Sequence, residues 1–277
     1  MGGGSEENKT YKFESWIPDN KKPYVCFNRN SEHFCIYCGK KSDTREHIPS
    51  KAFLRKPYPS DLAVLPACSS CNNSFSDDEL YTEIYIDALK HLSGYSNDIS
   101  IENKDRVFKN SAFLDAQNDV KLFYETGSIP NRKQIERVIL KLAIGHLVYE
   151  LSEGYGGVEW AGNPESIEYN FAFALNDSII ENYNEFVSLN GKILPEVGTR
   201  TYNNILVFEA KLSPCESIPN SNKQLIMPLA FMNWVDVQDG NYRYMAWMED
   251  GKTFVIKIVL HEFCYAKIVF KNETLLD

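Results

Sequence analysis

The chain has 277 residues, of which 43% are apolar and 24% are charged, and its formal net charge at pH 7 is −9. These values are typical of an ordinary soluble globular protein, and the negative charge argues against a uniformly basic nucleic-acid-binding protein. No run approaches the roughly 18 consecutive apolar residues of a membrane helix, and the N-terminal "MGGGSEENKTYK" lacks the apolar stretch of a signal peptide. We therefore expect a cytoplasmic protein that does not contact a membrane.

The N-terminal part is predicted to have little regular structure of its own. Residues 1–10 are expected to be a tag or disordered lead, because "MGGGS" is typical of an expression linker. Pro18 and Pro23 prevent a continuous helix, so residues 11–34 are predicted to be irregular. Residues 35–73 are rich in Cys, Pro, Ser and charge, with few apolar residues. Such a segment needs a staple other than hydrophobic burial, and a metal ion supplies one.

The next segments are predicted to be helices separated by loops. "SFSDDELYTEIYIDALKHLSG", residues 74–94, has acidic residues where a first helical turn favours them, Ser74 or Ser76 as a cap, and Gly94 at its end. Residues 94–130 are polar and weakly patterned, which indicates loops with short helical turns. "NRKQIERVILKLAIGHLVYELSEG", residues 131–154, has the clearest helical period in the chain.

From about residue 165 the pattern changes to short runs rich in Ile, Val, Phe and Tyr, with "QDGN" and "EDGK" as turn sequences between them. We therefore predict an α+β fold in which an N-terminal zinc-stapled module, residues 11–93, precedes an α+β body, residues 94–277. The sheet of the body is expected to be mostly antiparallel.

Two cysteine pairs predict a zinc site. Cys35-x2-Cys38 is followed after twenty-nine residues by Cys68-x2-Cys71. A CxxC turn lets two thiolates reach one Zn²⁺ at about 2.3 Å, and two such turns complete a tetrahedron that leaves no open position, which is typical of a structural site. Gly39 suits the tight turn after the first pair. Of the other cysteines, Cys264 is expected to pack within a strand, and Cys26 and Cys215 receive no assigned role.

The residues between and after these pairs carry a resemblance to a known family. "EHIP" spans Glu46–Pro49, and Asn72 follows the last cysteine. The order CxxC, acidic-His-Ile-Pro, loop, CxxC-Asn and helix resembles the HNH endonucleases of ββα-metal (treble-clef) type, in the branch with two zinc knuckles. The resemblance covers roughly residues 33–82. It implies hydrolysis of phosphodiester bonds in nucleic acid, DNA being the first expectation, and a ββα-metal fold for this segment.

The resemblance also implies roles for three residues. His47 would be the general base, and Glu46 and Asn72 would hold a catalytic Mg²⁺ or Mn²⁺ that is separate from the zinc. The chemistry agrees, because the pKa of histidine lies near the operating pH and carboxylate and amide oxygens suit a hard divalent ion. Adjacent side chains alternate on an extended strand, so the backbone must twist to bring Glu46 and His47 into one cleft.

The distribution of charged residues along the chain also indicates that an anion binds to this segment. Residues 9–60 carry eleven Lys and Arg against five Asp and Glu, whereas the rest of the chain is acidic. Some of these basic side chains surround the predicted site and are expected to contact phosphates without reading sequence. For each of them a solvated surface position is an alternative. They are Lys40, Lys41, Arg45, Lys51, Arg55 and Lys56.

The sequence departs from the family at two positions. The family usually has Asn five residues before the first cysteine of the second pair, where it braces the loop opposite the catalytic His, and this chain has Ala63. The family often has Lys three residues after the Asn, and this chain has Phe75. Neither residue is the predicted base or a predicted metal ligand.

Two alternatives to a nuclease remain open from the sequence. One is a zinc-knuckle module that binds nucleic acid without cutting it, and the other is a structural zinc clip that fastens the N-terminus to the body. "EHIP" favours the nuclease, because a clip needs no carboxylate beside an imidazole. Residues 94–277 contain no recognisable functional motif. We expect a regulatory or partner-binding role in which they recognise another protein, a small-molecule signal or a second copy of the chain, as accessory domains of defence-type or mobile-element nucleases do. His146 is expected to be a hydrogen-bonded core residue.

Overall fold

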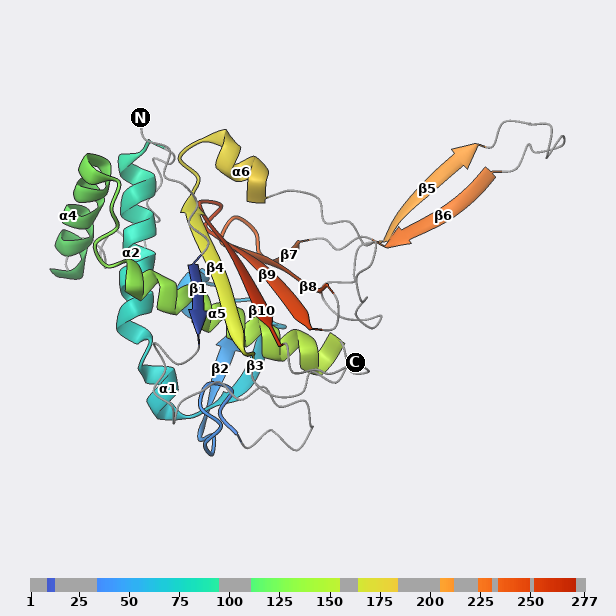
Figure 1. Cartoon of the computed structure of the whole chain (residues 1–277), viewed down its shortest axis with the longest axis horizontal. Helices are drawn as coiled ribbons and strands as arrows, with labels where there is room; N and C mark the ends of the chain where they lie inside the picture. Colours follow the sequence, from blue (N-terminus) through green and yellow to red (C-terminus); the bar gives the residue numbers. More distant parts are fainter. Residues whose placement is uncertain are drawn as a thin grey trace.

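The structure is a computed structural model of the whole chain. It describes residues 9–12, 34–94, 111–154, 164–183, 205–211, 224–230, 234–249 and 252–272, shown in Figure 1. The predictions for Cys26 and Cys215, and for most of the irregular lead-in, lie outside the described residues. Among the described helices, none is both long enough and apolar enough to cross a membrane.

An antiparallel sheet forms the body of the protein. Its strand order is β1-β4-β10-β9-β8-β7, and every neighbouring pair runs antiparallel, which confirms the predicted kind of sheet. The strands are β1 (Lys9–Lys12), β4 (Ser166–Phe173), β7 (Val235–Gln238), β8 (Tyr242–Met248), β9 (Thr253–Leu260) and β10 (Cys264–Lys271). A separate antiparallel ribbon pairs β5 (Ile205–Lys211) with β6 (Gln224–Ala230), and Figure 1 shows it apart from the sheet.

Three local features of the sheet bear on the predictions. Residues 9–12 pair with β4, so an edge strand begins within the segment that was expected to be a disordered and irregular lead. Gly240 in "QDGN" has a φ of +66°, as a tight turn between strands requires. Cys264 is buried within β10, which confirms its predicted place in a strand.

Long helices cover the sheet. α5 (Arg132–Gly154) contacts β8, β9 and β10, and α2 (Ser76–Leu92) packs against α5 and α4 (Ser111–Thr126). The short α6 (Asp177–Tyr183) follows β4. The helices predicted over 74–94 and 131–154 are therefore confirmed. His146 on α5 is buried, and its Nε2 lies 2.8 Å from the hydroxyl of Tyr242, as expected for a core histidine.

Two helical predictions were wrong in detail. Residues 111–126 form α4 instead of a loop, because Ala116 and Val120 are buried one turn apart although the residues between them are polar. The cap of α2 also differs, since Phe75 occupies the N-cap position without a side-chain hydrogen bond. The hydroxyl of Ser74 instead donates to the carbonyl of Cys71 at 2.8 Å, within the turn that joins α1 to α2.

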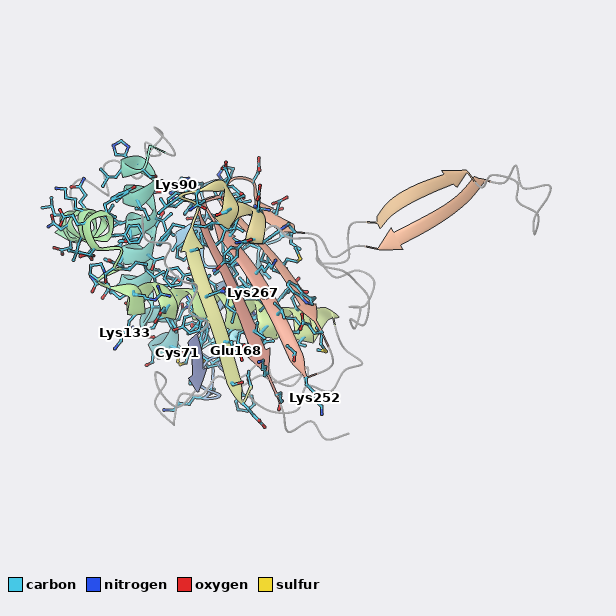
Figure 2. All side chains as sticks on the ribbon, turned by 45° about the horizontal axis from the view of Figure 1, so that its top comes forward. Cys71, Lys90, Lys133, Glu168, Lys252 and Lys267 are labelled. Atoms are coloured by element: carbon cyan, nitrogen blue, oxygen red, sulfur yellow. The ribbon has the colours of Figure 1, made fainter. Side chains whose placement is uncertain are left out.

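The N-terminal segment shares the core of the body. β2 (Thr44–Ile48) and β3 (Ala63–Ala67) form an antiparallel hairpin, interrupted by the short helix η4 (Lys51–Phe53) and followed by α1 (Ser69–Asn73). One cluster of buried side chains extends from this segment through α2 and α5 to the sheet, and it includes Cys35, Phe53, Tyr85, Ile139 and Phe270. Figure 2 shows Cys71 and Lys90 near opposite ends of α2, with side chains filling the space between helices and sheet. Packing is therefore continuous across residue 93.

The α5 helix approaches the hairpin closely. Glu46 and Ile48 on β2 are buried, whereas Arg45 is exposed and His47 is half-buried, as alternation along a strand requires. At Gly145 on α5, a Cβ atom would lie 2.5 Å from Cδ1 of Ile48, closer than two carbon atoms can approach. The glycine therefore lets the helix pack directly on the inner face of β2.

We predict that the Gly145→Ala substitution interacts strongly with Ile48→Val, which removes Cδ1. Alone, Gly145→Ala should lower the free energy of unfolding by about 1 kcal/mol, because overpacking of about 1–3 kcal/mol exceeds the roughly 1 kcal/mol that alanine gains in a helix. In the Ile48→Val background the same substitution should be neutral or stabilising. Denaturant unfolding of the four proteins measures this, and an equal effect of Gly145→Ala in both backgrounds would contradict the contact.

Candidate metal centre and Glu-His site

The four predicted zinc ligands come together at one point. Their Sγ atoms all lie within 4.8 Å of one another, with Cys38 and Cys68 3.7 Å apart. Four sulfurs around one Zn²⁺ at about 2.3 Å would be about 3.8 Å apart, so the spacing fits a tetrahedral zinc and is far too long for a disulfide. The four cysteines could therefore hold a metal ion such as zinc, as the sequence predicted.

Local backbone structure positions each sulfur. Gly39 has a φ of +66°, and the backbone N–H of Cys35 donates to the carbonyl of Lys40 at 2.7 Å, which closes the first turn as predicted. Cys68 is the N-cap of α1, where its Sγ accepts from the N–H of Cys71 at 3.4 Å. Asp43 connects the segment just before β2 to α1. Its carboxylate accepts hydrogen bonds from the backbone N–H of Ser69 at 2.6 Å and from the hydroxyl of Ser69 at 2.9 Å.

The cysteine cluster also has the electrostatics of a ligand set. A hydrogen bond with Cys71 lowers the pKa of Cys35 to about 5, and the same interaction raises the pKa of Cys71. Zinc binding to cysteine thiols releases their protons, because only thiolates are ligands.

We predict that Cys68→Ser removes zinc and destabilises the hairpin region, because the metal would join the turns that carry the two cysteine pairs. The zinc content should fall from about one ion per chain to near zero, with a clear loss of thermal stability. Cys264→Ala is the control, because Cys264 is also a free thiol but is buried in the core of the sheet, away from the cluster. Metal analysis would count against the site if Cys68→Ser kept its zinc or if Cys264→Ala lost it.

Glu46 lies inside the protein, in contact with α5. Its side chain is on the inner face of β2, opposite Leu65 of β3, and the residue is 4% exposed. One carboxylate oxygen lies 3.0 Å from Nζ of Lys141, which is itself 2% exposed. Desolvation raises the pKa of Glu46, and the Lys141 ammonium opposes that rise.

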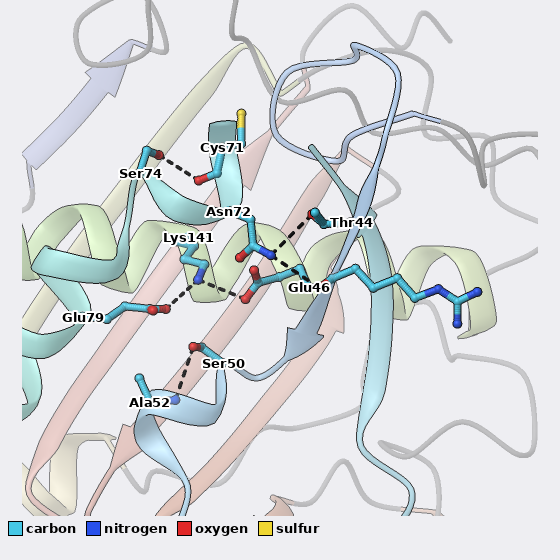
Figure 3. A network of polar contacts seen from close by, with 10 residues as sticks. Thr44, Glu46, Ser50, Ala52, Cys71, Asn72, Ser74, Glu79 and Lys141 are labelled. Carbon is cyan, nitrogen blue, oxygen red and sulfur yellow. Dashed lines mark hydrogen bonds and ion pairs between the residues drawn. The ribbon is translucent and has the colours of Figure 1, made fainter. Parts of the chain in front are cut away.

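Lys141 connects three elements. Its ammonium also lies 2.5 Å from a carboxylate oxygen of Glu79 on α2, so that it bridges two buried acidic groups, as Figure 3 shows. Its Nζ is also 5.2 Å from the ring centroid of Phe75, which stands three residues after Asn72. This bridge was missed from the sequence. The signal was a charged residue on the buried face of α5, at helical spacing from Val138 and Gly145.

Asn72 lies on the same side of the hairpin as Glu46. Its Nδ2 is 3.5 Å from Oγ1 of Thr44 and 3.4 Å from the backbone oxygen of Arg45, the residue before Glu46. Figure 3 shows the carboxamide of Asn72 and the carboxylate of Glu46 pointing into the same space, next to Lys141. Glu46 and Asn72 therefore bring one carboxylate and one carboxamide close to the Lys141 ammonium.

His47 lies on the opposite, outer face of β2. It pairs with the exposed Val64 of β3 and is half-buried. Desolvation and the nearby Lys51 ammonium lower the pKa of His47, which favours the neutral imidazole that a general base requires. A hollow on the hairpin is lined by Ser42, Asp43, Thr44, Arg45, Val64, Leu65 and Pro66. The structure thus places the side chains of Glu46 and Asn72 on the same side of β2 and that of His47 on the opposite face, so Glu46 and His47 do not share the single cleft that was expected.

The predicted phosphate contacts differ in their surroundings. Lys40, Lys41, Arg45 and Lys56 are exposed, and Lys51 is half-buried with its ammonium over the ring of Tyr58.

Arg55 is different, because its guanidinium lies 3.1 Å from Glu83 and 3.8 Å from Asp87 on α2. Its backbone N–H donates to Gln238 on β7 at 2.6 Å, and its carbonyl accepts from the same side chain at 2.7 Å. Arg55 therefore fastens the hairpin loop to the body.

Comparison of the chain with family models, curated proteins and solved structures found no significant match. The case for a function therefore rests on the geometry of these residues.

Proposed function

We propose that the protein is a metal-dependent endonuclease of HNH type that hydrolyses phosphodiester bonds of nucleic acid, in the first place DNA. The observation that carries the proposal is the joining of the Glu-His strand to the helix of the second cysteine pair. The four cysteine sulfurs lie within 4.8 Å of one another, α1 contacts β2, and the carboxamide of Asn72 donates to the carbonyl of Arg45, next to Glu46. A hairpin followed by a helix in this order supports a ββα-metal (treble-clef) arrangement, although α1 is short.

The proposed site would use two metal ions with different roles. Zinc on the four cysteines would be structural, because a closed four-sulfur site has no position for water. Glu46 and Asn72 would hold Mg²⁺ or Mn²⁺, which supplies charge stabilisation at the phosphate and at the departing 3′ oxygen. His47 would take a proton from water, the resulting hydroxide would form the new bond to phosphorus, and the bond to the 3′ oxygen would break. That oxygen then takes a proton from solvent.

A non-cutting zinc module that binds nucleic acid or serves as a clip is the second candidate. The ion pair between Glu46 and Lys141 favours it, because that carboxylate already has a cationic partner. Both candidates keep the zinc and the exposed basic residues, and they differ in whether a divalent ion and His47 act. For residues 94–277 we propose a regulatory or partner-binding role; their contribution of Lys141 to the site supports a coupling between the two parts.

We predict that His47→Ala abolishes cutting while leaving zinc content and thermal stability unchanged. Loss of a general base costs about 10²–10⁴-fold in rate, and the half-exposed side chain contributes little to packing. A plasmid-nicking assay in Mg²⁺ or Mn²⁺ measures the rate, and His91→Ala on the exposed end of α2 is the control. Equal cutting by His47→Ala would remove the proposed base. Binding without cutting in every divalent ion would establish the second candidate.

Arg45 and Arg55 are predicted to respond differently to substitution by alanine. Arg45→Ala should weaken DNA binding and reduce the slope of log affinity against log salt by about 0.9, as expected for one lost phosphate contact. Arg55→Ala should instead lower the free energy of unfolding by about 1.5–3 kcal/mol, because it leaves the carboxylates of Glu83 and Asp87 without this partner. Salt-dependent binding and denaturant unfolding test the pair; the same outcome for both variants would contradict this assignment.

A further inference from the structure

A buried cation already contacts the proposed metal ligand. The Lys141 ammonium lies between the carboxylates of Glu46 and Glu79, at 3.0 Å and 2.5 Å. All three residues are less than 9% exposed, so solvent screens their charges poorly. Together they carry a net charge of −1 when ionised, in place of the −2 that two carboxylates alone would present.

Packed elements surround the Lys141 ammonium. Gly145, one turn along α5, lies against Ile48 on the same face of β2, so helix and strand are in contact at two successive positions. The ring of Phe75 lies 5.2 Å from Nζ and closes another side. Lys141 therefore cannot reach solvent without separating packed elements.

A divalent ion bound by Glu46 and Asn72 would lie next to this ammonium. Like charges repel, and the repulsion is strong in a poorly screened interior. The ion must either bind beside Lys141 or take its place on Glu46, and both possibilities cost binding free energy.

We propose that Lys141 is an internal counter-ion that occupies the Glu46 carboxylate in the metal-free protein and opposes the binding of a divalent ion there. It is a positioning residue and not a catalytic one. The inference rests on the proposed function, because it takes Glu46 as a ligand of the catalytic ion. It adds that the body of the protein, through α5, sets the metal concentration at which the site fills.

The test is the binding of Mn²⁺ alone to the full zinc-loaded chain, followed by the electron paramagnetic resonance signal of free Mn²⁺ at constant pH. Glu46→Gln defines which part of the binding belongs to this site, since an acidic protein also binds Mn²⁺ elsewhere. Lys141→Met should bind Mn²⁺ at the Glu46 site at least about tenfold more tightly than the wild type. Lys257→Met is the matched control, because Lys257 is also a buried lysine but lies on β9 and donates to the carbonyl of Tyr183 at the end of α6. It should bind like the wild type.

Lys141→Met leaves two buried carboxylates without their cation and can therefore fail to fold. In that case a second pair of variants tests the proposal. Glu79→Gln should bind Mn²⁺ more weakly than the wild type, since it removes a negative charge and leaves Lys141 to Glu46 alone. Adding Lys141→Met to Glu79→Gln replaces a buried pair with neutral side chains and should restore tight binding.

The outcomes separate the two proposals. If the wild type cuts with Mn²⁺ but removal of Lys141 leaves the affinity unchanged or weaker in both backgrounds, the counter-ion is overturned and the nuclease stands. If no variant binds Mn²⁺ in a way that depends on Glu46, the proposed catalytic ion fails as well. Tighter binding without any cutting supports the counter-ion and overturns the nuclease.

Discussion

The buried bridge from Glu46 through Lys141 to Glu79 fixes the relation of the hairpin to the rest of the protein. Each of these groups would be costly to bury alone, and removing one partner of such a pair typically costs about 3–5 kcal/mol. If β2 moved away from α5 or α2, the remaining charged groups of the bridge would stay buried without their partners. The close approach at Gly145 adds a steric constraint to the electrostatic one.

This bridge and the cysteine cluster connect the hairpin to different elements. The cysteines join it to α1 and so bring Asn72 to the inner face of β2, whereas Lys141 holds that inner face against the body. The outer face, with His47 and the exposed Arg45, stays accessible. Alternation along one short strand thus separates a buried, charge-paired side from a side open to a polyanion. A reaction that uses both Glu46 and His47 therefore requires the reacting groups to reach both faces of β2 around the edge of the strand.

The two CxxC turns, the helices predicted over residues 74–94 and 131–154 and the strand-forming runs could be recognised from the sequence, because turn residues, helical periodicity and strand propensity are local signals. α4 was missed, since polar residues separate Ala116 and Val120. The partners of Glu46 and Arg55 were also missed, because they come from distant parts of the chain: Lys141 and Gln238 meet the hairpin only after the sheet and α5 have packed. The sequence does show a charged residue, Lys141, on the buried face of a helix. This pattern predicts that a partner exists but does not identify it.

The most direct test of the account is the position of Mn²⁺ in crystals of the zinc-loaded protein, located by anomalous scattering at a saturating Mn²⁺ concentration. The account predicts one manganese peak that contacts a carboxylate oxygen of Glu46 and the carboxamide oxygen of Asn72, distinct from zinc on the four sulfurs, with the Lys141 ammonium retained by Glu79. A Glu46 carboxylate that stays bonded to Lys141 alone, with manganese bound only elsewhere, would contradict it.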